Sequence, residues 1–250
     1  MTKFVFSDVH GEYAALLSSL DRAGFDPKNK EHELLCLGDS LDRGNENKQM
    51  LDMLLDYWKQ GRLTHIIGNH DQMLIDFLTG KDDGIFNAVH NGMMYTLDNL
   101  SGLEARKYIY DYPQLIIDKI FENYPEILEF YADGEDLVEI GNYQFMHAGY
   151  TNINKFEKWK NGVWEVDNWA RTDQFIQFFE KSPQYDPNKI YVFGHWHAFS
   201  LKDQFLGKKV NPDTHGFVRN HHTFKYKNYI GLDACTNLSG FVNILIVGEN

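Results

Sequence analysis

Short apolar runs in this 250-residue chain end, one after another, in a glycine beside Asp, Asn or His. Each pattern is weak alone, because motifs this short arise by chance. Several in order, most of them following a predicted strand, indicate that their polar side chains converge on one site. In chain order the motifs are Asp8-Val-His10-Gly, Gly-Asp39-Ser-Leu-Asp42-Arg43-Gly, Gly-Asn69-His70-Asp71, Met-His147-Ala-Gly and Gly-His195-Trp-His197.

The N-terminal part of the chain alternates between buried-strand patterns and amphipathic-helix patterns. This order predicts a parallel sheet with helical crossovers. In such sheets, ligand-binding groups collect where the strands end, and Asp8, Asp39 and Asn69 each follow a predicted strand. The predicted strands are 2–7, 33–37 and 63–67, and the predicted helices are 12–23, 47–59 and 70–78.

The middle of the chain has weak helical periodicity and no strong strand pattern, which predicts a helical cap insertion at about 82–131. Gly141-Asn142 predicts a hairpin turn between strands 137–140 and 143–145. No repeat or linker divides the chain, so we expect a single domain over 1–250. The other predicted elements are a helix over 169–179, a strand over 190–193, short strands and turns over 208–247, and a final strand over 241–247.

The chemistry of the motifs predicts metal binding. Carboxylate, amide oxygen and imidazole groups suit divalent Mn, Fe, Zn or Mg. Two such ions side by side can lower the pKa of a bridging water and neutralise phosphoryl oxygens. The motifs therefore predict two divalent metal ions and hydrolysis of a phosphate ester. We expect Asp39 to bridge the ions, because it lies between other candidate ligands and follows a predicted central strand.

From Asp8 to about Gly240, the chain resembles the calcineurin-like metallophosphoesterases, and among them the bacterial and phage-type serine/threonine phosphoprotein phosphatases. The most specific element is residues 38–44, because other metallophosphoesterases usually lack its Asp-Arg-Gly ending. Trp169-Ala-Arg171 and Leu232-Asp-Ala-Cys-Thr also match that family. The resemblance implies an α/β (α+β) fold, a mixed β-sandwich flanked by helices. It also implies phosphate monoester hydrolysis by direct attack of a metal-bridging hydroxide.

The resemblance also implies a role for each motif residue. His197 has no counterpart in the usual family motif, but in the wider superfamily a His at this spacing completes the first metal site. Manganese is the expected metal, with iron, zinc, magnesium or nickel as alternatives. The first metal would be held by Asp8, His10, Asp39 and His197, and the second by Asp39, Asn69, His147 and His195. His70 would protonate the leaving oxygen with Asp42 as its partner, and Arg43, Arg171 and Asn69 would bind the substrate phosphate.

Two departures from the family pattern leave the substrate open. Ile67 stands where the family often has Arg, and Asp71 stands where it usually has Glu. The related dinucleoside polyphosphate hydrolases, which act on diadenosine tetraphosphate-type substrates, also lack that Arg, although they seldom keep the full Asp-Arg-Gly ending. A third alternative, a non-catalytic metal-binding scaffold, is disfavoured because all candidate ligands and His70 are present.

Taken singly, each of these residues also fits a structural role. Asp8 or Asp39 alone would suit a helix N-cap, and Asn69 alone would suit a turn. His147 alone would suit a hydrogen-bonded core histidine, and Arg43 alone would suit a surface ion pair. Only the joint pattern favours the metal site.

Charge and cysteine content narrow the expected partners and location. The formal net charge of −12 disfavours a nucleic-acid surface or an anionic membrane surface. The expected partners are therefore a phosphorylated protein or peptide, or a phosphorylated small molecule or nucleotide. Neither a signal-peptide pattern nor a long apolar run is present, so a cytoplasmic location is expected. Reduced, packed thiols are favoured for Cys36 and Cys235, while a disulfide between them stays open.

Overall fold

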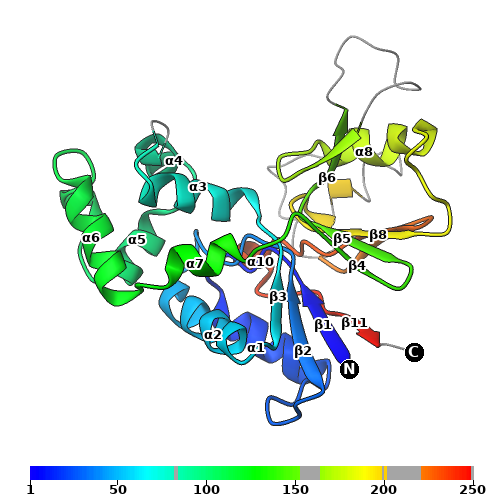
Figure 1. Ribbon diagram of the computed structural model, residues 1–250, viewed down its shortest axis with the longest axis horizontal. Coiled ribbons are helices and arrows are strands. Elements are labelled where there is room, and N and C mark those ends of the chain that lie inside the picture. Colours follow the sequence, from blue (N-terminus) through cyan, green and yellow to red (C-terminus); the bar gives the residue numbers. More distant parts are fainter. Residues whose placement is uncertain (82–83, 153–163, 199, 202–220, 249–250) are drawn as a thin grey trace.

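The computed structural model describes residues 1–81, 84–152, 164–198, 200–201 and 221–248 (Figure 1). Its strands are β1 (Thr2–Phe6), β2 (His32–Cys36), β3 (Leu63–His65), β4 (Leu137–Ile140), β5 (Tyr143–Met146), β6 (Gly149–Asn152), β7 (Trp164–Asp167), β8 (Ile190–Phe193), β9 (Phe224–Tyr226), β10 (Tyr229–Gly231) and β11 (Leu245–Gly248). Its α-helices are α1 (Tyr13–Arg22), α2 (Asn47–Lys59), α3 (Asn69–Leu78), α4 (Gly84–His90), α5 (Met94–Ser101), α6 (Pro113–Asn123), α7 (Ile127–Ala132), α8 (Thr172–Phe178) and α10 (Thr236–Ser239). The 3₁₀ helices among the described residues are η1 (Ala105–Lys107) and η3 (Phe179–Lys181).

Two mixed sheets carry the strands that position the motifs. The first has the order β11-β1-β2-β3, in which β1, β2 and β3 are parallel and β11 is antiparallel to β1. The second has the order β4-β5-β8-β10-β9, in which β5, β8 and β10 are parallel. The parallel sheet expected from the N-terminal sequence is confirmed, with one antiparallel strand added at its edge.

Alternating side chains on the strands divide the apolar core into layers. On β1, Val5 packs between the two sheets, whereas Phe6 joins the cluster beneath the helices. On β8, Val192 faces the first sheet and Tyr191 faces outward toward α8. This period-2 alternation lets each strand contribute to two apolar layers. Each fully buried large apolar side chain contributes roughly 1.5–3 kcal/mol to folding. The predicted β-sandwich flanked by helices is confirmed (Figure 1).

The helices α3 to α7 continue the core formed by α1 and α2. Leu54 on α2, Leu97 on α5, Ile120 on α6 and Phe130 on α7 belong to one cluster of buried side chains. In Figure 1 these helices lie to one side of the first sheet, and α8 lies on the opposite side of the molecule. Among the described helices, none has both the length and the apolar character needed to cross a membrane.

Two predicted element boundaries were wrong. The helix expected over 169–179 begins at Thr172, because Asp167 accepts hydrogen bonds from the Trp169 and Ala170 backbone and holds them in a turn. It follows a strand, β7, that was not expected. The final strand begins at Leu245 rather than 241, and before it the Asn243 side chain donates to the backbone carbonyls of His221 and Leu232. Of the predicted segment 208–247, residues 208–220 lie outside the described residues.

The third strand is also shorter than expected. It ends at His65, and Ile66 forms an isolated bridge with Glu135 rather than a continued ladder. Cys36 and Cys235 are both buried free thiols, as favoured from the sequence, so no disulfide joins them.

Candidate metal centre

The motif residues lie in loops that follow parallel strands of both sheets. The loop after β1 contacts the loop after β2, since Asp8 N donates to Gly38 O at 3.1 Å and His10 N donates to Asp39 O at 3.1 Å. The loops after β5 and β8 meet where Gly194 N donates to His147 O at 2.7 Å. Carboxyl ends of neighbouring parallel strands meet at one edge, so the motifs converge there.

The carboxylate of Asp39 belongs to two groups of side chains with the geometry of a metal site. One group is His10, Asp39 and His70, and the other is Asp39, His147 and His195. Within each group, one ligand atom from each residue lies within 4.8 Å of the others. Asp39 is the residue that the sequence marks as bridging, and its place in both groups fits that role. Carboxylate and imidazole donors at this spacing suit a divalent transition metal.

The amide of Asn69 completes the second group. Its Oδ1 lies 3.0 Å from His147 Nε2 and 2.8 Å from His195 Nδ1. Asn69 is the first residue of α3 and is buried. Asp39, Asn69, His147 and His195, the predicted ligands of the second metal, are therefore brought together.

The predicted first metal site is arranged differently. The Asp8 carboxylate is in neither group; its Oδ2 accepts hydrogen bonds from Ser7 Oγ at 2.5 Å and His195 N at 2.8 Å. His197 is also in neither group, and its Nε2 lies 3.8 Å from Asp233 Oδ2. His70, expected as the acid, takes the third position beside His10 and Asp39.

Backbone carbonyls orient two of the candidate imidazole ligands. His10 Nδ1 lies 3.0 Å from Leu41 O, and His147 Nδ1 lies 2.7 Å from Leu37 O. A carbonyl only accepts, so each Nδ1 carries a proton and each Nε2 faces the site. Displacing any proton from Nε2 then leaves the tautomer that a metal-ligating histidine needs.

His70 is held at both ring nitrogens. Its Nδ1 lies 2.7 Å from Asp42 Oδ2, and the other Asp42 oxygen accepts a 2.5 Å bond from Thr96 Oγ1. Arg43 spans two rings, with its guanidinium nitrogens 2.9 Å from His10 Nε2 and 2.9 Å from His70 Nε2. Because guanidinium only donates, both Nε2 atoms accept in this arrangement. The predicted His70–Asp42 pair is thus present, with Arg43 beside it.

Burial and mutual charge set the protonation of the centre. Burial favours the neutral acid of Asp39, but the His147 and His70 imidazoles outweigh it and hold the Asp39 pKa well below its usual value. Burial likewise lowers the pKa of His147, yet the Asp39 carboxylate raises it to about 10. Burial and then the Asp233 carboxylate raise the pKa of Asp8. For His70, burial is outweighed by Asp39 and Asp42, so its pKa is raised.

Backbone strain is concentrated at the same place. Among the described residues, the non-glycine positions with positive φ are Asp8, His10, Asp39, Asp42, Arg43, His195, Lys227 and Cys235. All but the last two belong to the predicted site. Left-handed backbone is costly for residues with a Cβ and persists at functional sites that the surrounding structure enforces.

Arg171 is the N-cap residue of α8 and is exposed. Its backbone carbonyl accepts from Gln174 N and Phe175 N, which begins the helix. Its predicted phosphate-binding role stays a prediction.

Several buried polar residues that support the centre were given no role from the sequence, although Asp71 and Asp233 stand in the motifs quoted above. Asp71 Oδ2 accepts from both Gly68 N and Asp39 N at 2.9 Å, which ties two loops together. Asp233 follows β10 and faces His197. Its position directly after a strand is the same signal that marked Asp8 and Asp39. Thr96 and Asn47, which bind Asp42, carry no comparable sequence signal.

We predict that Gly68→Ala disturbs this centre. A Cβ on Gly68 would lie 2.2 Å from Asp39 Oδ1 and 2.6 Å from Asp39 N. Because a backbone nitrogen cannot swing aside, the two loops must separate, at a cost of roughly 1–3 kcal/mol. Thermal unfolding with and without Mn²⁺ should show lower stability and weaker metal stabilisation. Gly248→Ala is the matched control, since its added Cβ has no contact within 4 Å in the part of the chain that the structure describes, its chain neighbours apart. Equal behaviour of the two variants would contradict the prediction.

Comparisons with known proteins agree with this geometry. The family model described as calcineurin-like phosphoesterase matches residues 1–209. The chain is 29% identical over 149 residues to serine/threonine-protein phosphatase 2 of Escherichia coli (strain K12), covering 59% of this chain and 58% of that protein. It is 24% identical over 83 residues to bis(5'-nucleosyl)-tetraphosphatase PrpE of Bacillus velezensis, covering 31% of this chain and 33% of that protein.

The chain thus matches less than two thirds of the length of these curated relatives. Among solved structures, a cold-active protein tyrosine phosphatase superposes with a TM-score of 0.50 at 15% identity, covering 100% of this chain and 74% of that one. At this identity the likeness shows a shared fold.

Proposed function

This chain belongs to the calcineurin-like phosphoesterase family, and we propose that it hydrolyses phosphate monoesters with two bound divalent metal ions. One observation carries the proposal: the Asp39 carboxylate is shared by two groups of candidate ligands, as a bridging ligand would be. Every member of both groups is buried except His195, which is partly exposed, and both groups lie at the edge where the loops of the two sheets meet. The donor set of carboxylate, amide oxygen and imidazole fits manganese, which we propose as the working metal.

We propose that His10 and Asp39 hold the first metal together with Asp8 and His197, and that Asp39, Asn69, His147 and His195 hold the second. Such a metal pair supplies an activated water and neutralises the oxygens of the transferred phosphoryl group. The tautomers fixed by Leu37 O and Leu41 O support this assignment for His147 and His10.

Arg43 and His70 would act on the substrate itself. The Arg43 guanidinium has the forked geometry that suits phosphate oxygens. We propose that it leaves the two imidazoles for the phosphate when substrate binds, so that His70 Nε2 becomes available to carry a proton to the leaving oxygen. Asp42 keeps its contact with Nδ1 and stabilises the protonated ring. Arg171 would add a second phosphate contact from the start of α8.

The helices in residues 82–131 are proposed to form a cap within a single domain. Two contacts support this role: Thr96 on α5 binds Asp42, and Gly92 O accepts from Arg43 N at 2.9 Å. The insertion therefore reaches the His70 and Arg43 side of the centre. It would limit which substrates can present a phosphate there.

For the substrate, we propose a serine or threonine phosphoprotein or phosphopeptide. The Asp42-Arg43-Gly44 ending and the name of the Escherichia coli relative support this choice. The competing proposal is a dinucleoside polyphosphate, which Ile67 in place of Arg and the name of the Bacillus velezensis relative support. A cytoplasmic location and the absence of a nucleic-acid partner stay proposals, in keeping with the net charge of −12.

The deciding experiment compares initial rates of the Mn²⁺-loaded protein on a phosphoserine peptide and on diadenosine tetraphosphate at equal concentration. Faster peptide turnover supports the phosphatase proposal. Faster dinucleotide turnover would reject the phosphoprotein substrate while leaving the metal centre intact. Stoichiometric metal binding without turnover of any phosphoester would reject catalysis altogether and favour a binding scaffold.

Metal affinity should rise with pH. Burial and Asp233 raise the pKa of Asp8, and the Asp39 carboxylate overcomes burial to raise that of His147 to about 10. Groups with raised pKa values keep their protons to higher pH in the metal-free protein, so binding must displace them. Mn²⁺ affinity should then increase about tenfold per pH unit for each proton displaced. Calorimetric titration at pH 6, 7 and 8 measures this; an affinity independent of pH would contradict it.

A further inference from the structure

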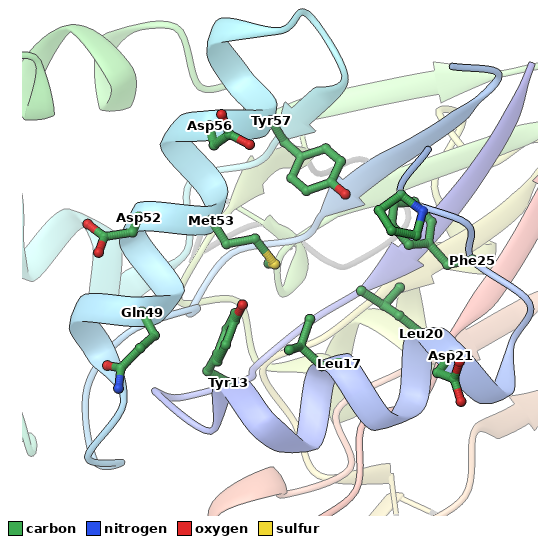
Figure 2. A pocket seen from close by; sticks show the side chains of 11 residues that line it. Tyr13, Leu17, Leu20, Asp21, Phe25, Gln49, Asp52, Met53, Asp56 and Tyr57 are labelled. Atoms are coloured by element: carbon green, nitrogen blue, oxygen red, sulfur yellow. The ribbon is translucent and has the colours of Figure 1, made fainter. Parts of the chain in front are cut away.

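A groove between α1 and α2 lies outside the metal centre and is lined by apolar side chains (Figure 2). Its volume is about 680 Å³, within the range of roughly 300–1,000 Å³ typical of small-molecule sites. In Figure 2, Tyr13 and Leu17 point from α1 toward Met53 on α2. The lining residues are Tyr13, Leu17, Leu20, Asp21, Phe25, Pro27, Gln49, Asp52, Met53, Asp56 and Tyr57. The candidate metal ligands are not among them.

Some of this apolar surface is left open to solvent. Leu17 is 42% exposed although it faces the groove, and Met53 is only partly buried. The floor is better covered, because Leu20 is 2% exposed and Tyr57 is 9% exposed. An apolar group bound in the groove would cover the exposed apolar walls. This binding is favourable because it removes apolar surface from water.

The rim of the groove is acidic. Asp21 extends from α1, and Asp52 and Asp56 extend from α2. The negative charge of Asp52 is compensated, since its carboxylate pairs with Lys48 at 2.9 Å and accepts a hydrogen bond from Tyr124 Oη at 3.0 Å. In the described part of the chain, no Lys or Arg lies within ion-pairing distance of Asp21 or Asp56. Asp56 accepts only a neutral bond from Gln60, at 2.8 Å.

Aromatic faces add to the preference for a cation. The Arg62 guanidinium lies 5.0 Å from the Tyr57 ring centre, so this ring already has a cation near it. The Arg62 guanidinium also donates hydrogen bonds to the backbone carbonyls of Pro27, Asn29 and His32. Tyr13 and Phe25 have no comparable cation contact among the described residues. An aromatic face attracts an organic cation placed over it.

We propose that the groove is a binding site for a small organic cation, a protonated amine carried on an apolar body. The apolar body would cover Leu17, Met53 and Phe25, and the ammonium group would lie at the acidic rim beside Asp21 or Asp56, which lie at opposite ends of the groove (Figure 2). An anion of the same shape would meet the same carboxylates and be repelled. Phosphorylated substrates are therefore poor candidates for this groove, which separates it in chemistry as well as in position from the metal centre.

The test uses a matched pair of probes, 4-phenylbutylamine and 4-phenylbutyrate, titrated into the full-length protein labelled with ¹⁵N. The amine should shift amide resonances of α1 and α2, and it should bind at least about fivefold more tightly than the carboxylate. Equal affinity of the two probes would overturn the charge-based proposal. Absence of any shift in α1 and α2 at millimolar amine would overturn the site.

Two variants test the residues named. Asp21→Asn combined with Asp56→Asn should weaken amine binding about fivefold and leave carboxylate binding no weaker. Asp118→Asn is the matched control, because Asp118 is also an exposed helical carboxylate bound to a Gln one turn away, at 2.8 Å. An equal loss in the control would reject a local role for the rim.

Leu17→Lys gives an independent check. Leu17 is exposed enough for the substitution to fold, and it would place a tethered ammonium group inside the groove. It should reduce amine binding, while unchanged binding would reject the assigned pose. Light scattering across the same protein concentrations measures self-association. If the wild type forms a dimer and the Leu17→Lys variant does not, a second copy of the chain occupies this face. That result would also overturn the proposal.

Discussion

Asp39→Asn should lose metal binding and catalytic turnover together. The Asp39 carboxylate is the ligand common to both candidate groups, so its charge faces both metal positions at once. The amide is nearly the same size, and its oxygen can still accept the 2.8 Å bond from His70 N. The change therefore removes charge with little change in shape. Because a metal pair contributes several kcal/mol to phosphoryl transfer, turnover should fall by about 10³-fold or more.

The measurement for Asp39→Asn is calorimetric Mn²⁺ titration beside initial rates on a phosphoserine peptide. Asp76→Asn is a suitable control, since Asp76 lies on α3 and pairs with Lys81 at 2.6 Å, away from both groups. If Asp39→Asn still bound two Mn²⁺ ions at wild-type affinity, Asp39 could not be the bridging ligand. Metal bound normally with turnover lost would leave Asp39 a catalytic role but a different one.

The positions of the motifs could be predicted from the sequence because they depend on local rules. Strands β1, β2 and β3 are each followed within a few residues by a motif that holds a glycine and a polar ligand, and these polar residues reach the same edge. Asp39, Asn69 and His147 are found together there, as the pattern predicted. The two-residue turn at Gly141-Asn142 could also be predicted from the sequence, and β4 and β5 pair across it.

Long-range contacts were beyond the sequence pattern. Thr96 binds Asp42 at a sequence separation of 54, and nothing around Thr96 marks it as a site residue. The start of α8 depends on how Asp167 binds the next turn, which periodicity alone does not encode. The spacing of the motifs also does not decide whether His70 or Asp8 joins His10 and Asp39 in the first group of side chains. Both residues come close to Asp39 only in the folded chain. For this reason His70 gives the most informative experiment.

His70→Asn should keep both metals and lose kcat. The expectation is that His70 protonates the leaving oxygen, and loss of such a general acid lowers turnover by about 10²–10⁴-fold. The geometry offers a competing role, because His70 lies with His10 and Asp39 within 4.8 Å. Removing a metal ligand and removing a general acid have different measurable effects. Loss of a ligand weakens Mn²⁺ binding, whereas loss of an acid leaves binding unchanged and slows only those substrates whose leaving group needs a proton.

Two substrates with the same phosphate and different leaving groups separate these roles. On phenyl phosphate, whose leaving oxygen is basic, His70→Asn should show its full loss. On p-nitrophenyl phosphate, whose leaving group departs as an anion, the loss should be much smaller. Asp42→Asn is the matched partner variant: it removes the contact that helps raise the pKa of His70. A general acid acts only while protonated. As the pH rises, the activity of Asp42→Asn should therefore begin to fall at a lower pH than the activity of the wild type. Equal losses of His70→Asn on both substrates, together with weakened Mn²⁺ binding, would instead make His70 a metal ligand.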